Sequence, residues 1–201
     1  TNLNTASTRA LVVDPINPAI LYSGGEFGVY RSTNGATNWQ AVNSSLGNQT
    51  VRALAINPVT STTLYAATAG GIYRSVTSGA GWAAFNNGLG NLSAQALAID
   101  PATPATIYVG TAAGVFKSLN GGTNWNAASV GLTTSNINSL AISPAAPDTI
   151  YAGTTNGMFK SLDAGQTWTR QTNSFSIWDF LCVAVNPQTP NTVFAGTRGT
   201  N

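Results

Sequence analysis

Four of the five tryptophans in this chain recur at a constant interval of 43 residues, and this spacing constrains the fold more than any other sequence feature. They are Trp39, Trp82, Trp125 and Trp168. A fixed period of about 40 to 50 residues indicates a repeat protein, in which each repeat buries its apolar surface against its neighbours. The spacing therefore predicts four stacked copies of one small unit.

Each repeat contains four short runs with the composition of β-strands. The first run, such as ALAID at 96–100, is apolar on both faces, so we expect it to be buried on both sides. The second and third runs, such as TIYVGT at 106–111 and GVFKS at 114–118, alternate more. No stretch of about ten residues shows apolar residues at helical spacing. Four short antiparallel strands per repeat match one blade of a β-propeller.

The sequence thus predicts an all-β fold, a β-propeller of four-stranded antiparallel blades with four complete blades and a partial fifth. We expect 1–201 to form a single propeller region. The partial blade would expose a sheet edge at 192–197, and native proteins avoid such edges. We therefore expect further blades, from the same chain or a second one, and favour the same chain. The expected blades are 10–52, 53–95, 96–138, 139–181 and, in part, 182–201.

The strand order sorts the loops onto two faces of the molecule. All nine prolines lie between first and second strands, where a residue that cannot donate to a strand ladder is tolerated. In an antiparallel blade these loops share a face with the loops between third and fourth strands. We name it the repeat face, because its loops are alike in every copy. The turns between second and third strands and the links between blades form the opposite, variable face.

Composition excludes several classes of function. Eight basic and six acidic residues give a net charge of +2 without a Lys/Arg cluster, so no nucleic-acid partner is expected. No apolar run approaches the length of about 18 residues that a membrane span needs. Histidine is absent and Cys182 is the single cysteine, which argues against a zinc site, a nucleophilic triad and an internal disulfide. Cys182 is interpreted as a small core residue.

The segment before each of the four tryptophans carries a family resemblance. Residues 161–168 read SLDAGQTW and match S-x-D-x-G-x-T-W, the Asp-box of bacterial neuraminidase-type (BNR) repeats. The other copies are weaker, since Asn34, Thr77 and Asn120 stand at the Asp position. With its strands, the chain resembles blades of sialidase-like, xyloglucanase-like, photosystem assembly-factor and sortilin-type propellers. The resemblance implies the fold but not the activity, because these families share blades and differ in function.

We expect the Asp-boxes to be structural. Each closes a hairpin in which an Asx side chain accepts backbone N–H groups, a glycine takes positive φ and a tryptophan packs between blades. The alternative, a calcium site, needs several carboxylate oxygens, and three of the four boxes contain none. No metal ion or other cofactor is therefore expected. The box residues are Ser32, Asn34, Trp39; Ser75, Gly79, Trp82; Ser118, Asn120, Gly122, Trp125; and Ser161, Asp163, Gly165, Thr167, Trp168.

The candidate ligand site is on the variable face, where the copies depart from the repeat. Function usually resides on loops that a rigid scaffold holds in place. Phe27, Phe175 and Trp178 offer an aromatic platform for a sugar ring or a protein anchor; alternatively, some of them cover the end of the propeller core. The charged candidates on this face are Glu26, Asp179 and Arg198.

A basic residue recurs in every third strand, as Arg31, Arg74, Lys117 and Lys160. A ring of positive charge would suit an anionic partner. The same side chains would equally lay their aliphatic stems over the sheet and pair with carbonyls or aromatic rings. The blade-building interpretation is favoured, because the residue recurs in every complete copy.

The acidic residues do not favour an enzyme. Glycosidases generally need two carboxylates that flank the scissile bond. Only Glu26 and Asp179 of the six acids are expected on the variable face, on the first and fourth blades. Sialidases also group three arginines around the substrate carboxylate, and here only Arg198, with Arg9 and Arg52 near strand starts, are available. The match is poor, and no catalytic residue is assigned.

The favoured function is therefore non-catalytic: a secreted, periplasmic or cell-surface propeller module, bacterial in type, that binds a glycan or a protein or serves as a scaffold. The first alternative is a fragment of a sialidase-like or xyloglucanase-like glycoside hydrolase whose catalytic residues lie largely outside this chain. The second is a structural subunit of an extracellular filament or surface assembly, which a repetitive surface with few charges would suit.

Overall fold

The computed structural model describes residues 7–47, 49–171 and 178–198, and these residues form only strands and the turns and loops between them. They build four four-stranded antiparallel sheets and one two-stranded sheet. We number these sheets as blades 1 to 4 and the partial blade 5. The all-β architecture of four-stranded antiparallel blades with a partial last blade confirms the fold predicted from the repeat.

Every complete blade keeps the strand order of the sequence. Blade 1 contains β1 (Thr8–Val13), β2 (Leu21–Gly25), β3 (Gly28–Ser32) and β4 (Gln40–Ala41); blade 2 contains β5 (Val51–Ile56), β6 (Leu64–Thr68), β7 (Gly71–Ser75) and β8 (Ala83–Ala84); blade 3 contains β9 (Ala94–Ile99), β10 (Ile107–Thr111), β11 (Gly114–Ser118) and β12 (Asn126–Ala127); blade 4 contains β13 (Ile137–Ser143), β14 (Ala146–Thr154), β15 (Gly157–Ser161) and β16 (Thr169–Arg170); and blade 5 contains β17 (Asp179–Val185) and β18 (Val193–Arg198).

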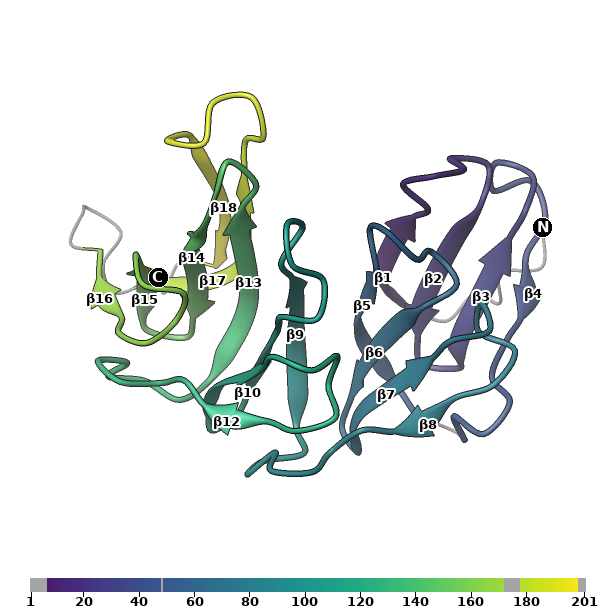
Figure 1. Ribbon diagram of the computed structural model, residues 1–201, viewed down its shortest axis with the longest axis horizontal. Coiled ribbons are helices and arrows are strands. Elements are labelled where there is room, and N and C mark those ends of the chain that lie inside the picture. Colours follow the sequence, from purple (N-terminus) through teal and green to yellow (C-terminus); the bar gives the residue numbers. More distant parts are fainter. Residues whose placement is uncertain (1–6, 48, 172–177, 199–201) are drawn as a thin grey trace.

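The blades follow one another in chain order along an arc (Figure 1). The first strands β1, β5, β9, β13 and β17 lie toward the middle of the view, and the fourth strands β4, β8, β12 and β16 lie toward its periphery. Each first strand contacts the first strand of the next blade, from β1 and β5 through to β13 and β17. The strands β1 and β18 thus belong to blades at opposite ends of the arc.

The hydrophobic core is divided among the junctions between blades. Each of three clusters of buried residues draws its members from two consecutive blades. Tyr22, Tyr65 and Tyr108, at one repeat position, are each at most 2% exposed. A blade therefore acquires its core from its neighbours, as expected of a repeat protein.

The burial of the strands differs from the sequence expectation. The second strands β6 and β10 are buried along their whole length, whereas the first strands β5 and β9 are only partly buried. A second strand lies inside its sheet and is covered by blades on both sides. A first strand is the inner edge of its sheet, so an apolar sequence there does not imply burial on both faces.

Sheet faces that no described blade covers remain exposed. Leu11 on β1 is 59% exposed, although Leu54, its equivalent in blade 2, is 7% exposed. Phe194 on β18 is 61% exposed, although the equivalent Tyr65 is 2% exposed. Cys182 on β17 is exposed for the same reason, so its interpretation as a core residue is wrong.

The tryptophans of blades 2 to 4 join each blade to the one before it. The indole N–H donates to a backbone carbonyl of the preceding blade, and the side chains are 3% to 4% exposed. Trp39 in blade 1 instead donates to Ala36 O of its own box, at 3.1 Å. The three bonds between blades join Trp82 to Val42 O, Trp125 to Phe85 O and Trp168 to Ala128 O, each at 2.8 Å.

The contrast between Trp125 and Trp39 gives a stability prediction. Trp125→Phe leaves the Phe85 carbonyl without its indole donor, which costs about 1–3 kcal/mol when the acceptor stays buried. Trp39→Phe loses a bond to Ala36, which is exposed, so water replaces the donor. We expect Trp125→Phe to lower the free energy of unfolding more than Trp39→Phe, as measured by urea denaturation followed by circular dichroism. Equal losses in the two variants would contradict this role of the indole N–H.

Candidate functional site

Every first strand contains a β-bulge at the same repeat position. In a bulge two residues of one strand oppose a single residue of its partner, which redirects the extra side chain; bulges are common beside binding and active sites. The extra residue follows the first paired residue of β1, β5, β9 and β13 and the second paired residue of β17, so all five bulges lie at the variable face. We name these residues the bulge row: Arg9, Arg52, Gln95, Asn138 and Leu181.

The middle three side chains of the bulge row each reach the next blade. Each donates a hydrogen bond to a side chain 41 residues further on, just before or at the start of the next first strand. The row is therefore a line of polar contacts that crosses three junctions. The bonds are Arg52 Nη1 to Ser93 Oγ (2.9 Å), Gln95 Nε2 to Asn136 Oδ1 (2.6 Å) and Asn138 Nδ2 to Asp179 Oδ1 (2.7 Å).

At the blade 1 end of the row, Arg9 forms an ion pair with Glu26. The Arg9 Nη2 to Glu26 Oε1 distance is 3.5 Å, and the two side chains are 49% and 45% exposed. Such an exposed pair contributes little to stability. Phe27 beside Glu26 is 53% exposed. A hollow of about 770 Å³ adjoins them, lined by Glu26, Phe27, Asn43, Ser45 and Gly47.

At the other end of the row, Asp179 lies between two donors. Arg198 Nη2 is 2.7 Å from Asp179 Oδ2, across the register pair that joins β17 to β18. Asn138 donates to the other carboxylate oxygen and also to Phe180 O. Trp178, directly before β17, is half-buried, and its carbonyl accepts the Gly157 N–H at 3.0 Å.

The structure does not bring the predicted ligand residues into one group. Glu26 and Phe27 belong to blade 1, whereas Trp178, Asp179 and Arg198 lie at or next to blade 5, at the opposite end of the arc (Figure 1). Glu26 and Asp179 therefore do not flank a common bond, as the two carboxylates of a glycosidase must. Phe175 lies outside the described residues.

Sequence reasoning missed the bulge row as a unit. The sequence pattern marks Arg9 and Arg52 only as arginines near strand starts, and it does not mark Gln95 or Asn138. A signal is present, because the position just before the small residue of each first strand (Ala, Ala, Ala, Ser and Cys) reads Arg, Arg, Gln, Asn and Leu. Variation at one position of an otherwise regular strand is the sequence feature that indicates the bulge row.

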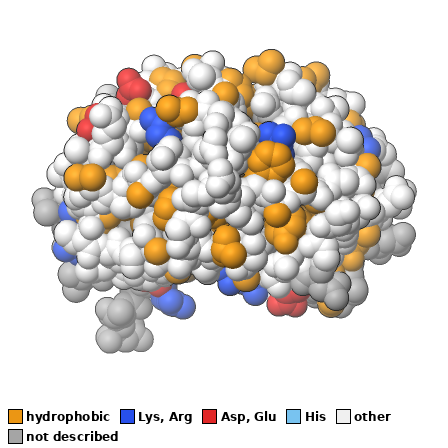
Figure 2. Space-filling model, turned by 60° about the horizontal axis from the view of Figure 1, so that its bottom comes forward, with side chains coloured by type: hydrophobic (Ala, Val, Ile, Leu, Met, Phe, Trp, Pro, Cys, Tyr) orange, Lys and Arg blue, Asp and Glu red, His pale blue; other side chains and the backbone are white. Residues whose placement is uncertain are grey.

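The surface around these groups has few charges. Figure 2 shows scattered basic and acidic side chains among neutral polar and apolar surface. In the part of the chain that the structure describes, no group of three or more His, Cys, Asp or Glu side chains is placed to hold a metal ion. The same residues include no helix long and apolar enough to cross a membrane.

The Asp-boxes on the repeat face form closed hydrogen-bonded turns. In blade 4, Asp163 accepts from the Ser161 hydroxyl and from both the N–H and the hydroxyl of Thr167. The Ser161 oxygen in turn accepts the N–H of Gly165, which has φ of 80°. Asn34 and Asn120 accept the equivalent bonds through their amide oxygens, and Thr77 through its hydroxyl.

Two of the periodic basic residues contact the box of the next blade, and the other two lie near a tyrosine ring of their own blade. Arg74 Nη1 and the Tyr65 hydroxyl both donate to Gly121 O in the box of the next blade, at 3.0 and 3.2 Å. Lys117 and Tyr108 make the same pair of bonds to Ala164 O, both at 2.9 Å. The cationic groups of Arg31 and Lys160 lie 5.9 and 5.4 Å from the ring centres of Tyr22 and Tyr151.

No protein-family model matches the chain, and a search of curated proteins finds no match. Its likeness to solved structures is extensive. An ancestral GH74 enzyme is 24% identical, with a TM-score of 0.83 over 97% of this chain and 28% of that protein. YCF48 bound to D1 peptide is 13% identical, with a TM-score of 0.71 over 98% and 64%. The extracellular domain of a hybrid two-component system from B. thetaiotaomicron is 17% identical, with a TM-score of 0.76 over 98% and 26%.

The chain has the fold of β-propeller blades. The three similar structures share this fold, although they are described as an enzyme, a protein bound to a peptide and an extracellular domain. At such low sequence identities they therefore show the fold alone. The chain spans less than two thirds of the length of each of them. The expected likeness to repeat propellers is confirmed, and the choice between a binding module and an enzyme fragment depends on the site.

The Asp163 box gives a pH-dependent prediction. Hydrogen bonds from the Thr167 hydroxyl, the Thr167 N–H and the Ser161 hydroxyl lower the pKa of Asp163 from its ordinary 3.8 to about 2. Because the folded pKa is lowered, the ionised carboxyl stabilises the fold above pH 3.8, and this contribution is lost as the pH falls toward 2.

Asp163→Asn keeps an acceptor at this position, as Asn34 and Asn120 do in other boxes. We expect the Tm of the native protein to exceed that of the variant most above about pH 4, and the difference to shrink as the pH falls toward about 2. Thermal unfolding across this range measures it, and the other carboxyls cancel in the comparison. A difference that stays constant with pH would show that the carboxylate charge has no part in the turn.

Proposed function

We propose that this chain is a non-catalytic propeller module of a secreted, periplasmic or cell-surface protein, and that it binds a glycan or a protein ligand across the bulge row of the variable face. The observation that carries the proposal is the change of side chain at one fixed, bulged position. The rest of the blade is nearly the same in every repeat. The same backbone position therefore carries different hydrogen-bond donors in different blades. Arg9, Arg52, Gln95 and Asn138 together supply cationic and amide donors.

The geometry of the row suits an extended ligand. The bulged side chains come from consecutive first strands, so they are spaced along the arc rather than gathered around one point. Amide and guanidinium donors recognise the hydroxyls of a glycan and the carbonyls of a peptide equally well. Among the similar proteins, YCF48 is bound to a peptide and another structure is an extracellular domain, which supports this kind of role and location.

We propose further that 1–201 is one propeller region, with blades near 10–52, 53–95, 96–138 and 139–181 and a partial blade at 182–201. The exposed faces at Leu11 and Phe194 carry the same apolar residue types that are covered at the inner junctions. We expect further blades, from this chain or another, to cover these faces.

A fragment of a glycoside hydrolase is the second candidate, because the chain matches part of a GH74 enzyme. The two acids of the variable face do not support it. Glu26 is paired with Arg9, and Asp179 with Arg198 and Asn138. Release of reducing sugar from xyloglucan oligosaccharides by the native protein would overturn the non-catalytic proposal.

The proposal predicts that ligand affinity depends on Arg52. We suggest titrating the protein with neutral and uronate-containing oligosaccharides and with acidic peptides, following tryptophan fluorescence and calorimetry. Arg52→Ala removes a charged hydrogen-bond donor, so we expect binding to weaken about tenfold, which corresponds to about 1.4 kcal/mol. Trp178→Ala tests whether the change in fluorescence on ligand binding comes from the Trp178 indole.

The control is Val59→Ala, a change to a 70% exposed residue in a proline loop of the repeat face. It should leave the affinity unchanged. Absence of binding to all three ligand classes, or equal weakening in Arg52→Ala and Val59→Ala, would contradict a site on the variable face.

A further inference from the structure

The junctions between blades contain one groove whose filling changes along the chain. Val42, Phe85 and Ala128 occupy the same repeat position, just after the fourth strand. The backbone carbonyl of each accepts the indole N–H of the next blade at 2.8 Å. The same bond thus anchors the backbone at all three junctions, whereas the side chain at this position changes from one junction to the next.

The groove between blades 2 and 3 is filled by Phe85. The guanidinium carbon of Arg74 lies 3.8 Å from the centre of the Phe85 ring, which is a close cation–π contact. The Cβ atom of Phe85 also lies near Gly122 in the box of blade 3. Between blades 1 and 2, the side chain of Val42 lies directly against the equivalent Gly79.

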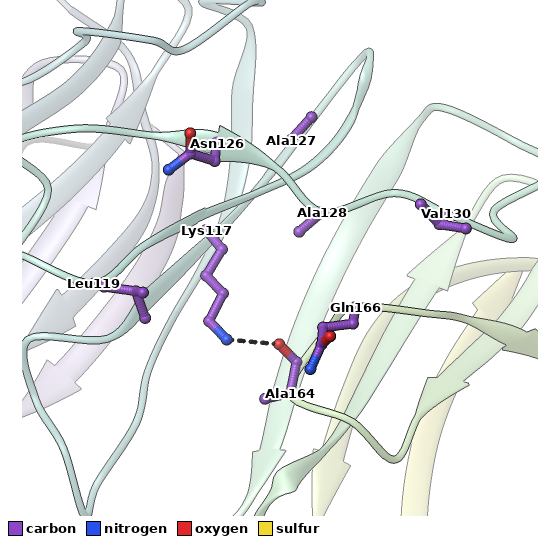
Figure 3. Close-up of a pocket in the computed structure, with 9 residues that line it drawn as sticks. Lys117, Leu119, Asn126, Ala127, Ala128, Val130, Ala164 and Gln166 are labelled. Carbon is purple, nitrogen blue, oxygen red and sulfur yellow. Dashed lines mark hydrogen bonds between the residues drawn. The ribbon is translucent and has the colours of Figure 1, made fainter.

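The groove between blades 3 and 4 is open, because Ala128 stands where Phe85 stands one blade earlier. A hollow of about 320 Å³ remains, with Ala128 and Gly165 in its lining (Figure 3). Lys117 reaches across it from blade 3 to Ala164 O of blade 4. Leu119 and Val130, on the rim, are 67% and 68% exposed. We name this hollow the Ala128 pocket.

The chemistry of the Ala128 pocket is that of a small amphipathic site. Its volume lies at the lower end of the range of about 300–1,000 Å³ found for ligand pockets. The Lys117 ammonium has three donors, and the bond to Ala164 O uses one of them. Asn126 and Gln166 add amide groups, and none of the lining residues is acidic. An apolar ring next to an anion matches this combination.

We propose that the Ala128 pocket binds an aromatic group that carries a carboxylate. The ring takes the space that the Phe85 ring fills at the preceding junction, and the carboxylate pairs with Lys117 Nζ. A free aromatic acid and the carboxyl-terminal aromatic residue of a peptide share this chemistry. The pocket is built from box and outer-strand residues away from the bulge row, so it stands independently of the function proposed for the variable face.

The repeat supplies matched variants for the test. Ala128→Phe closes the pocket with the residue found naturally at the preceding junction, and Phe85→Ala opens a second pocket between blades 2 and 3. The probes are 3-phenylpropanoate, its amide, and the peptide acetyl-Gly-Gly-Phe with a free carboxyl terminus. Backbone amide shifts of Asn126, Val130 and Gln166, followed by ¹H–¹⁵N NMR titration, report binding to the pocket.

We expect both carboxylate probes to shift these resonances in the native protein, at least tenfold weaker binding in Ala128→Phe, and new shifts around Gly122 in Phe85→Ala. Tighter binding of the peptide than of the free acid would identify a peptide terminus as the natural source, and the reverse order a free acid. Absence of shifts with either carboxylate probe at about 10 mM, or unchanged binding in Ala128→Phe, would overturn the proposal.

Lys117→Gln keeps the test decisive if Ala128→Phe fails to fold. We expect the native protein to prefer 3-phenylpropanoate to its amide by about tenfold, and Lys117→Gln to bind the two alike. An equal preference for the acid in both proteins would overturn the assignment of the carboxylate to Lys117. Oligosaccharide binding at the bulge row should be the same in all these variants, so failure of one proposal is distinguished from failure of the other.

Discussion

The hydrogen bond from a box tryptophan to the preceding blade is the interaction on which the rest of this structure depends. A single four-stranded blade has two apolar faces and no core of its own, so its stability comes from its neighbours. At the junction of blades 3 and 4, the Trp168 indole and the Tyr108 hydroxyl cross in opposite directions, one donating to blade 3 and the other to blade 4. Two oppositely directed bonds around a packed core fix both the distance and the angle between consecutive sheets. The strand order decides on which face a loop lies, and the angle between sheets decides how the loops of consecutive blades lie relative to one another.

A junction fixed through backbone carbonyls leaves the side chains at those positions free to change. Phe85 and Ala128 accept the same indole bond, yet one fills a groove and the other opens it. The bulge row follows the same logic on the opposite face. A bulge is a feature of the backbone, so Arg52 and Asn138 have the same backbone position in their blades although their side chains differ chemically. Both candidate sites thus arise where the repeat constrains the main chain and not the side chain.

The sequence predicted the fold because its signals are local: the 43-residue tryptophan interval, the strand composition and the turn residues all lie within one repeat. It failed where the answer depends on neighbours. The first strands look fully buried by composition but form the inner edge of each sheet, and Cys182 aligns with inner-strand residues but lies on a face that no described blade covers. Departure from the repeat predicts that Glu26 and Asp179 lie on one face. The distance between Glu26 and Asp179 depends on how the blades are arranged along the arc, and no pattern of residues within a repeat predicts that arrangement.

The small number of charged residues helps to identify which residue of the bulge row a ligand would contact. Arg9 and Arg198 already face carboxylates, so an anionic ligand must compete with Glu26 or Asp179 for them. Arg74 and Lys117 are held by box carbonyls away from this face. Arg52 donates instead to the neutral hydroxyl of Ser93. A ligand carboxylate or hydroxyl that approaches Arg52 therefore displaces a weaker partner, because a charge-assisted bond is about twice as strong as one to a neutral acceptor. On a surface with so little charge, this difference favours Arg52 as the first residue to test in the binding site that we propose on the variable face.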